Sequence, residues 1–440
     1  MTDKKTPTAG PFLVLTFIYF IVGFLTTVNG QFQGPMKVAF LSNAEELRNT
    51  LTTLISFFFF LGYLLNSSTG GKWINRHGYK TTLMRALGVM CGGLLMYALS
   101  SWVVNAYPDL HVTVGTDSIP GAYFVFLFGS YLMGTSAALL QVVINPYIAA
   151  YELPGTKPVQ RMNIVCATNS FGTTIAPFFV TGIIFAGVAI ESVTADSLLI
   201  PFILIALCIA VTLLVTSRLH LPDIEGTRSN PEEKLERSVW SFRHLTLGVV
   251  AIFFYVGTEV AVGVNVNLHA MELIEKGMGP SFFGKDHIVL WGLDLGIPAL
   301  LATLYWGGLM VGRLIFSFFK NVPPRLLLIV TTILATILII IAIISNNLWV
   351  LVSVGLCHSV MWGCIFTLAI AQLGKYTSKA SGVFMMGVFG GAVFPVLQGI
   401  LADAWGGWQW TWVIALVCEL FMLYYALHGY KPKSLPEDKA

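Results

Sequence analysis

The sequence is poor in charge. Only 11% of its 440 residues are Asp, Glu, Lys or Arg, while 56% are hydrophobic. A soluble domain carries roughly 25% charged residues, so this chain lacks the water-facing surface that a soluble fold requires. Its mean hydropathy of +0.77 indicates that most of the chain is solvated by lipid. The net charge of +3 is too small to point to a nucleic-acid partner.

The motifs of common enzymes are also missing. The sequence contains no phosphate-binding glycine loop, no Ser/His/Asp set and no metal-ligand cluster. All six cysteines fall in apolar runs, and even Cys357 and Cys364 are seven residues apart, which predicts free thiols that pack as small hydrophobes. We therefore expect no enzyme, no metal and no cofactor, and we expect any energy source to be an ion gradient.

Long apolar runs take the place of these features. A membrane-spanning helix needs about 20 apolar residues, and the sequence holds twelve such runs. The first leads into the polar stretch TTVNGQFQGP rather than a small-residue cleavage site, so we expect a retained span and no cleavable signal peptide. The runs cover residues 11–35, 51–70, 82–104, 121–149, 161–187, 197–217, 245–271, 299–319, 326–345, 348–371, 380–402 and 409–428.

Basic residues set the expected orientation of these spans. With both termini in the cytoplasm, only Lys37, Arg48, Lys276 and Lys285 of the 25 lysines and arginines fall in outer loops. Cytoplasmic loops normally carry the excess of Lys and Arg, so this alternation supports an even number of spans. We expect a multi-pass protein of the cytoplasmic (inner) membrane of a bacterium, with both termini cytoplasmic.

A central polar segment divides the chain in two. Residues 218–243 lie between the sixth and seventh runs and carry both signs of charge. We predict an N-terminal six-helix bundle at 1–217, a cytoplasmic linker at 218–243 and a C-terminal six-helix bundle at 244–440.

The two halves echo each other in sequence. Gly172 precedes Pro177 by five residues in the fifth run, and Gly390 precedes Pro395 by five residues in the eleventh. Parallel six-span repeats are the architecture of major facilitator transporters, which bind their substrates near the midplane between the halves. The sequence therefore predicts an all-α membrane protein, with twelve transmembrane helices in the major facilitator fold arranged as two six-helix bundles.

Side-chain amides interrupt several spans. Buried amides without partners cost free energy, so they should face a cavity, another helix or a ligand. Amides both donate and accept hydrogen bonds, as sugar hydroxyls require, although pairing between helices explains any single amide equally well. Asn29 and Gln33 are four residues apart on one face of the first span, while Gln31 points elsewhere. The candidate sugar-binding amides are Asn29, Gln33, Gln141, Asn145, Asn163, Asn169, Asn267 and Gln398.

Glu259 is an acid in the middle of the seventh span. A carboxylate at the bilayer centre costs roughly 2.5–3.5 kcal/mol, so it should face the protein interior. Tyr255, Gly263 and Asn267 lie one and two turns away on roughly the same face. A buried acid can carry a proton, and its oxygens can hold a sodium ion. Glu259 is our candidate for cation coupling; the alternative is a structural carboxylate bonded to a neighbouring helix.

Other polar and aromatic residues within the spans are weaker candidates. Trp306 and Trp362 can pack on the apolar face of a sugar ring, although a tryptophan in a membrane core often only packs. Arg313, near the cytoplasmic end of the eighth span, is a candidate gating residue. We expect Glu419 and His358 to be structural residues, and we expect Asp403 to be an interfacial charge at a helix end.

The loop GGKWINRHGYKTT, between the second and third runs, resembles the major facilitator signature. That signature has a glycine and an acidic residue, then arginine, glycine and a basic residue. Gly71, Arg76, Gly78 and Lys80 match it, whereas Asn75 stands where the acid is usual. We add Arg76 to the candidate gating residues.

Longer stretches resemble one family within that superfamily. They are LLQVVINPYIAA, RMNIVCATNSFGTTIAP, FYVGTEVAVG, YWGGLMVGR, SVMWGCIFTLAI and GKYTSKASG followed by GGAVFPVLQGILAD. Together they are similar to the fucose:proton symporter family, and within it to the bacterial glucose/galactose transporter branch. The resemblance implies inward sugar transport by alternating access, driven by a cation. It also implies sugar contacts on Gln141, Asn145, Asn163 and Asn169.

Departures from the family pattern shift the expected coupling site. The fucose permease type has an Asp after the Asn of its first span and a Glu in its fourth span, but here Gly30 follows Asn29 and Gln141 takes the place of the Glu. Glu259 is then the leading coupling residue. Gly363 and Cys364 stand where the branch often has Pro-Thr, which leaves the identity of the sugar open.

These patterns predict a monomeric hexose transporter that carries glucose, galactose, mannose or fucose together with a sodium ion or a proton. We expect its partners to be the sugar and membrane lipids, with no nucleic acid. A uniporter or a drug/proton antiporter of the same fold is an alternative. An alternative from another class is a membrane-embedded sugar-handling enzyme or receptor.

Overall fold

The computed structural model describes residues 9–42, 44, 46–151, 153–154, 158–180, 182, 194–219, 221, 237–290, 293–316, 322–373 and 376–432. The helices of the first part are α1 (Ala9–Gln31), α2 (Gln33–Ala39), α3 (Arg48–Ala106), α4 (Gly121–Ala150), α5 (Pro158–Phe179) and α6 (Ala195–Arg218). Those of the second part are α7 (Arg243–Val260), α8 (Val266–Glu275), α9 (Ile297–Phe316), α10 (Pro324–Ser345), α11 (Leu348–His358), α12 (Met361–Ala369), α13 (Thr377–Met386), α14 (Gly390–Trp405) and α15 (Val413–Tyr424).

Eleven segments of the described chain are long and apolar enough to cross a membrane, and a shorter apolar helix covers 164–179. The twelve predicted runs coincide with these twelve segments. Backbone polar groups in lipid must be satisfied internally, which a helix does within one segment. The outward faces of the spans carry apolar side chains, as lipid contact requires. Ile200, Leu204 and Leu207 of α6, for example, are each more than half exposed. The predicted all-α membrane fold with twelve spans is confirmed.

Several spans are built from more than one helix. The seventh joins α7 to α8 through a π-helical turn, η4 (Ala261–Asn265). The tenth is broken between α11 and α12, and the eleventh runs from α13 into α14 through a 3-10 turn, η6 (Gly387–Phe389). By contrast, the single helix α3 continues through two spans. It bends at Gly78, whose φ of 78° and ψ of 174° are a conformation that glycine adopts readily. Irregular backbone at membrane depth is tolerated where it is buried in protein or lines a cavity.

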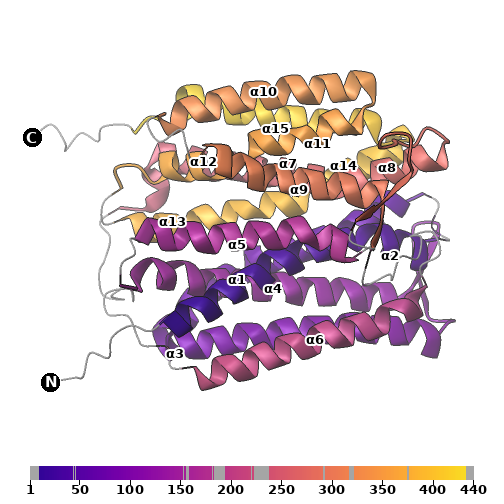
Figure 1. Cartoon of the computed structure of the whole chain (residues 1–440), viewed down its shortest axis with the longest axis horizontal. Coiled ribbons are helices and arrows are strands. Elements are labelled where there is room, and N and C mark those ends of the chain that lie inside the picture. The colour runs from indigo at the N-terminus through magenta and orange to yellow at the C-terminus, as the bar shows by residue number, and fades with distance from the viewer. Residues whose placement is uncertain are drawn as a thin grey trace, which may run out of the picture.

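The helices form two groups, which Figure 1 shows as a lower and an upper layer. In the lower layer α1 packs on α4 and α5, and α3 packs on α4 and α6; in the upper layer α7 packs on α12, α14 and α15. Contacts of α3 with α14 and of α5 with α9 join the layers. The predicted boundaries at 217/218 and 243/244 stay a prediction, because residues 222–236 of the linker lie outside the described part.

The glycine echo in the sequence has a structural reason. A Cβ on Gly172 would collide with the backbone oxygen of Phe20, and a Cβ on Gly390 would collide with that of Phe253. These contacts join the first span to the fifth and the seventh span to the eleventh. Small residues let membrane helices approach closely, and here the same close crossing occurs once in each half.

One end of the molecule carries two short antiparallel hairpins (Figure 1). They are β1 (His111–Val114) with β2 (Asp117–Pro120) and β3 (His287–Leu290) with β4 (Leu293–Gly296). We call this end, which also holds α2 and α8, the hairpin end. Both hairpins fall in segments that the sequence marked only as loops.

Candidate functional site

The predicted amides of the fourth and fifth spans converge on two tyrosines. Asn169 of α5 donates to the backbone oxygen of Tyr19 at 2.9 Å, and the side chain of Asn145 in α4 interacts with the Tyr19 hydroxyl. Gln141, one turn before Asn145, donates to the hydroxyl of Tyr63 at 2.7 Å. The Oδ1 atom of Asn145 is buried without a partner among the described residues. We call these five side chains, from α1, α3, α4 and α5, the amide cluster.

Asn163, predicted as a further sugar contact, belongs to α5, but its side chain lies outside the described part of the structure. The two predicted amides of the first span bond inside the first half. Asn29 accepts from the hydroxyls of Tyr97 and Ser130, the latter at 2.9 Å, and Gln33 donates to the Ser56 hydroxyl at 2.9 Å. Their assignment to sugar binding stays a prediction.

Gln31, between those two amides, is the residue that reaches the second half. Its Oε1 accepts from the side-chain amide of Asn267, and its Nε2 lies 3.4 Å from the backbone oxygen of Gly263. Gln31 and Asn267 are 4% and 7% exposed, and Oδ1 of Asn267 has no partner in the described chain. Sequence reasoning placed Gln31 on another face and did not see that this face meets the opposite half.

The predicted coupling residue, Glu259, sits in a polar network of the second half. Tyr255 donates to Oε1 of Glu259 at 2.8 Å, and its hydroxyl also lies 3.0 Å from the backbone oxygen of His358. Arg313 and His358 lie close enough to influence Glu259 electrostatically. An intramembrane acid with these neighbours is compensated, as buried charges must be.

The predicted tryptophans and Gln398 have different surroundings. Trp306 of α9 is 9% exposed and packs on Gly263, which has no room for a Cβ, while its indole Nε1 has no partner among the described groups. Trp362 stacks on Phe366 with ring centroids 5.3 Å apart. Gln398 accepts from Asn265 at 2.9 Å and donates to Thr411 at 3.0 Å, so both ends of its amide are used within the second half.

Of the two predicted gating arginines, Arg313 bridges the halves. Its Nη1 donates to the hydroxyl of Ser170 in α5, and its Nε donates to the backbone oxygen of Ser359 at 3.3 Å. Ser359 follows α11 at the break in the tenth span. Arg76 is exposed on the loop side of the Gly78 bend. The gating role of both residues stays a prediction.

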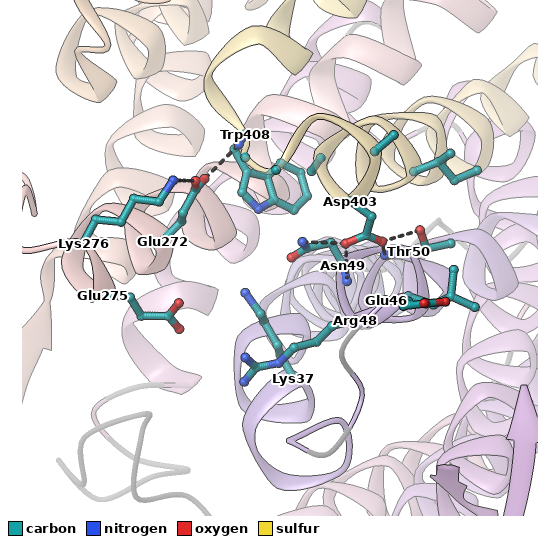
Figure 2. A pocket seen from close by; sticks show the side chains of 16 residues that line it. Lys37, Glu46, Arg48, Asn49, Thr50, Glu272, Glu275, Lys276, Asp403 and Trp408 are labelled. Carbon is teal, nitrogen blue, oxygen red and sulfur yellow. Dashed lines mark hydrogen bonds and ion pairs between the residues drawn. The ribbon is translucent and has the colours of Figure 1, made fainter. Parts of the chain in front are cut away.

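A cavity of about 890 Å³ opens at the hairpin end between the halves. Lys37 and Arg48 line it from the first half, and Glu272, Asp403 and Trp408 line it from the second (Figure 2). Asp403 accepts hydrogen bonds from Asn49 and Thr50, as Figure 2 shows, so this predicted helix-end charge contacts the opposite half. None of the predicted sugar-binding residues lines this cavity.

This fold and these buried polar clusters are those of a multi-pass membrane transporter. The model of the Major Facilitator Superfamily matches residues 15–391, and the chain belongs to that superfamily.

Two curated relatives align with 95% of the chain. The glucose/galactose transporter of Brucella abortus is 31% identical over 428 residues, with 95% of this chain and 93% of the relative covered. The putative glucose/galactose transporter of Helicobacter pylori is 30% identical over 433 residues, with 95% and 96% covered. The resemblance to the glucose/galactose branch is thereby confirmed.

Among solved structures, the fucose:proton symporter of E. coli superposes with a TM-score of 0.64 at 19% identity, covering 96% of this chain and 99% of that one. This likeness concerns the fold, which agrees with the predicted architecture.

Proposed function

We propose that this transporter carries a hexose such as glucose, galactose, mannose or fucose inward across the bacterial inner membrane, together with a sodium ion or a proton. The names of its relatives, glucose/galactose transporter and L-fucose-proton symporter, support a monosaccharide as the substrate. The choice among these sugars and between the two ions is left to the experiment below.

The amide cluster is the observation that carries the proposal. Tyr19, Tyr63, Gln141, Asn145 and Asn169 present hydroxyl and amide groups from four helices of the first half. None of the five is ionised at neutral pH, and together they donate and accept hydrogen bonds. A neutral polyhydroxylated molecule matches such a set better than an organic cation, because an antiporter pocket for cations should be apolar and acidic.

Glu259 supplies the proposed link to the ion gradient. It faces the protein interior from the seventh span, bonded to Tyr255 at 2.8 Å. A carboxylate held by one phenol can bind a proton, or it can contribute oxygen ligands to a sodium ion. In either case the bound cation lowers the cost of keeping the acid buried while the halves reorient.

Closure at the hairpin end supports alternating access. We assign this end to the outside, because Lys37, Arg48, Lys276 and Lys285 are the few basic residues expected there. Contacts of Gln31 with Asn267 and of Asp403 with Asn49 and Thr50 then hold the outer ends of the two halves together. A state held together at this end would release sugar toward the cytoplasm, where we place both termini.

The test is uptake of labelled hexoses into liposomes that contain the purified protein. A sodium gradient and a proton gradient are imposed separately, with a trial lacking any gradient as the control. Accumulation under one gradient supports symport and names the ion. Saturable equilibration without accumulation identifies a uniporter, and the absence of hexose movement contradicts the sugar assignment.

A further inference from the structure

A second acid lies deep in the protein, behind Glu259. Glu419 of α15 and His358 of α11 are both 0% exposed, and Nε2 of His358 lies 2.8 Å from Oε1 of Glu419. The other ring nitrogen, Nδ1, lies 2.7 Å from the hydroxyl of Tyr305 in α9. Three helices of the second half therefore meet at one imidazole.

The number of protons that Glu419 and His358 share sets the net charge of the pair. With one proton on the imidazole and none on the acid, the pair carries a full negative charge in an apolar bundle. Oε2 of Glu419 is buried without a partner in the described part of the chain, so half of that charge has no donor facing it. Leaving a buried charge uncompensated is strongly destabilising. One additional proton, on either the acid or the ring, makes the pair neutral overall.

We propose that Glu419 and His358 together bind one exchangeable proton, as a second protonation site outside the sugar pocket, and that this proton controls the reorientation of the transporter. The proposal rests on the proposed function, because the reorientation in question is a step of the transport cycle. Glu419 and His358 act here as positioning residues, since neither belongs to the amide cluster.

The pair can influence the transport cycle because His358 ends α11 at the break in the tenth span. The backbone oxygen of His358 lies 3.0 Å from the Tyr255 hydroxyl, which also donates to Glu259. A phenol has one hydrogen, so Tyr255 donates either to the Glu259 carboxylate or to this carbonyl. When Glu259 is protonated, the Tyr255 hydrogen becomes free to bond the backbone oxygen of His358 at the break in the tenth span.

The next residue extends the connection to the other half. The backbone oxygen of Ser359 accepts from Arg313, which also donates to Ser170 of α5. The His358 side chain thus fixes the break in the tenth span to α15 and α9. Backbone oxygens of the same break contact Tyr255, which bonds to Glu259, and Arg313, which bonds to Ser170 in the other half. A neutral pair keeps the imidazole in place, whereas loss of the proton charges the pair and favours displacement of the ring toward water.

The titratable and charged groups around the pair lie on α7, α9, α11 and α15. They are Tyr255 and Glu259 of α7, Tyr305 and Arg313 of α9, Cys357 of α11 and Cys418 of α15. Arg313 is the cation among them, and it donates hydrogen bonds to Ser359 and Ser170 rather than to Glu419. The helix α10 also packs on α11 and α15, but its one charged residue, Arg325, donates to the backbone oxygen of Ala426 at 3.2 Å.

A proton suits this site better than a sodium ion. Hard cations prefer several oxygen ligands, whereas Glu419 offers one unpaired oxygen beside an imidazole. No group of three or more His, Cys, Asp or Glu side chains arranged to hold a metal occurs among the described residues. Imidazole ordinarily changes charge between about pH 5 and pH 8, the range in which transport is measured.

The experiment follows both proton binding and transport. Infrared spectra of the purified protein, recorded as a titration across that pH range, report the carboxyl and imidazole bands. Sugar exchange in liposomes without any gradient reports reorientation at each pH. Both are measured for the unaltered protein, for Glu419→Gln and for His358→Gln. His269→Gln is the matched control, because His269 is a 2% exposed imidazole bonded to Trp412 at 3.0 Å, and no carboxylate of the described residues hydrogen-bonds to it.

We expect the unaltered protein and His269→Gln to share a carboxyl and imidazole titration that both Glu419→Gln and His358→Gln lack, read from difference spectra in which the bands of the other histidines and acids cancel. Glutamine imitates a neutral acid, so exchange by Glu419→Gln should proceed at the low-pH rate of the unaltered protein at every pH. A pH profile of exchange that Glu419→Gln leaves unchanged overturns the proposal. An equal loss of exchange at every pH with a correctly folded protein also overturns it, because the pair is then only structural.

The infrared difference titration separates this proposal from the proposed function. If the spectra of the unaltered protein and of Glu419→Gln titrate alike, the second protonation site is wrong even where hexose uptake is observed. If the titration is present in a protein that moves no hexose, the proposed function fails and the protonation site stands.

Discussion

Asp403 at the end of α14 caps the first turn of α3 across the boundary between the two halves. Its Oδ2 accepts from the backbone N–H of Thr50 at 2.8 Å, and its Oδ1 accepts from that of Asn49 at 3.2 Å. The side chains of the same two residues also donate to it. A carboxylate at a helix N-terminus satisfies orphan N–H groups and favours the helix dipole. Here that stabilisation exists only while the hairpin end is closed.

Asp403→Asn should therefore favour opening of this end. Hydrogen bonds to a charged group contribute about 1.5–3 kcal/mol, and each 1.4 kcal/mol changes an equilibrium about tenfold. We measure the labelling rate, by an impermeant reagent added outside, of the thiol introduced by Thr53→Cys, a buried position packed on Gly399 of the other half. Adding Asp403→Asn should raise this rate by about tenfold.

The chain offers a close control for this effect. Asp117 accepts from the backbone N–H of Leu47 at 2.9 Å, directly before the same helix, but lies in the same half. Asp117→Asn should leave the labelling rate unchanged. Equal labelling in the two variants contradicts the assignment of Asp403 as the residue that holds the halves together.

Glu259→Gln tests the coupling residue. Glutamine keeps the size and the bond to Tyr255 but cannot bind a proton or supply a charge to a sodium ion. Accumulation of hexose against a gradient should be abolished while exchange continues. Glu275→Gln, an exposed acid of α8 in the same span, is the control and should accumulate normally. Concentrative uptake by Glu259→Gln at the normal level excludes the coupling role.

Asn169→Ala tests the amide cluster. The substitution removes the donor to Tyr19 and one polar group of the proposed sugar site. A hydrogen bond contributes about 0.5–1.5 kcal/mol net, so sugar affinity measured by calorimetry should fall about three- to tenfold. Asn66→Ala is the control, since Asn66 donates to Tyr131 and Thr135 outside the cluster. Unaltered affinity in Asn169→Ala moves the sugar elsewhere.

Arg313→Lys tests the proposed gate. Lysine keeps the charge but loses the planar fork that donates in two directions, to Ser359 and Ser170. The maximal transport rate should fall several-fold, about threefold or more, with a smaller change in the sugar concentration at half-maximal rate. In a double-mutant cycle, Ser170→Ala should add little to Arg313→Lys. If the losses of transport rate from the two substitutions simply add, the Arg313–Ser170 contact has no functional role.

The architecture was readable from the sequence because it depends on local composition. Apolar runs give the spans directly, and eleven of the twelve reappear within about six residues of their predicted ranges, while most of the C-terminal part of the fifth, beyond Phe179, lies outside the described residues. The Gly172 and Gly390 echo was readable for the same reason, and the collisions with Phe20 and Phe253 now explain it.

The site was only partly readable, since pairing between distant residues leaves no mark in one sequence. Glu419 and His358 are 61 residues apart, and the tyrosines that bind the amides looked like ordinary aromatic packing residues. Gln31 was passed over for a different reason. Helical spacing correctly separates its face from that of Asn29 and Gln33, but one sequence does not say which face of the span meets the second half.

The π-helical turn at 261–265 gives the seventh span an adjustable joint. A π turn holds one residue more than an α turn, so a return to α spacing would rotate everything beyond it by about 100°. Asn267 lies beyond the joint and Glu259 before it, and the Gly263 carbonyl that the turn presents is the one Gln31 approaches. A slip of one residue would exchange the partner of Gln31 while leaving the acid where it is. A change at this turn would therefore rotate the Asn267 end of the span relative to the Glu259 end.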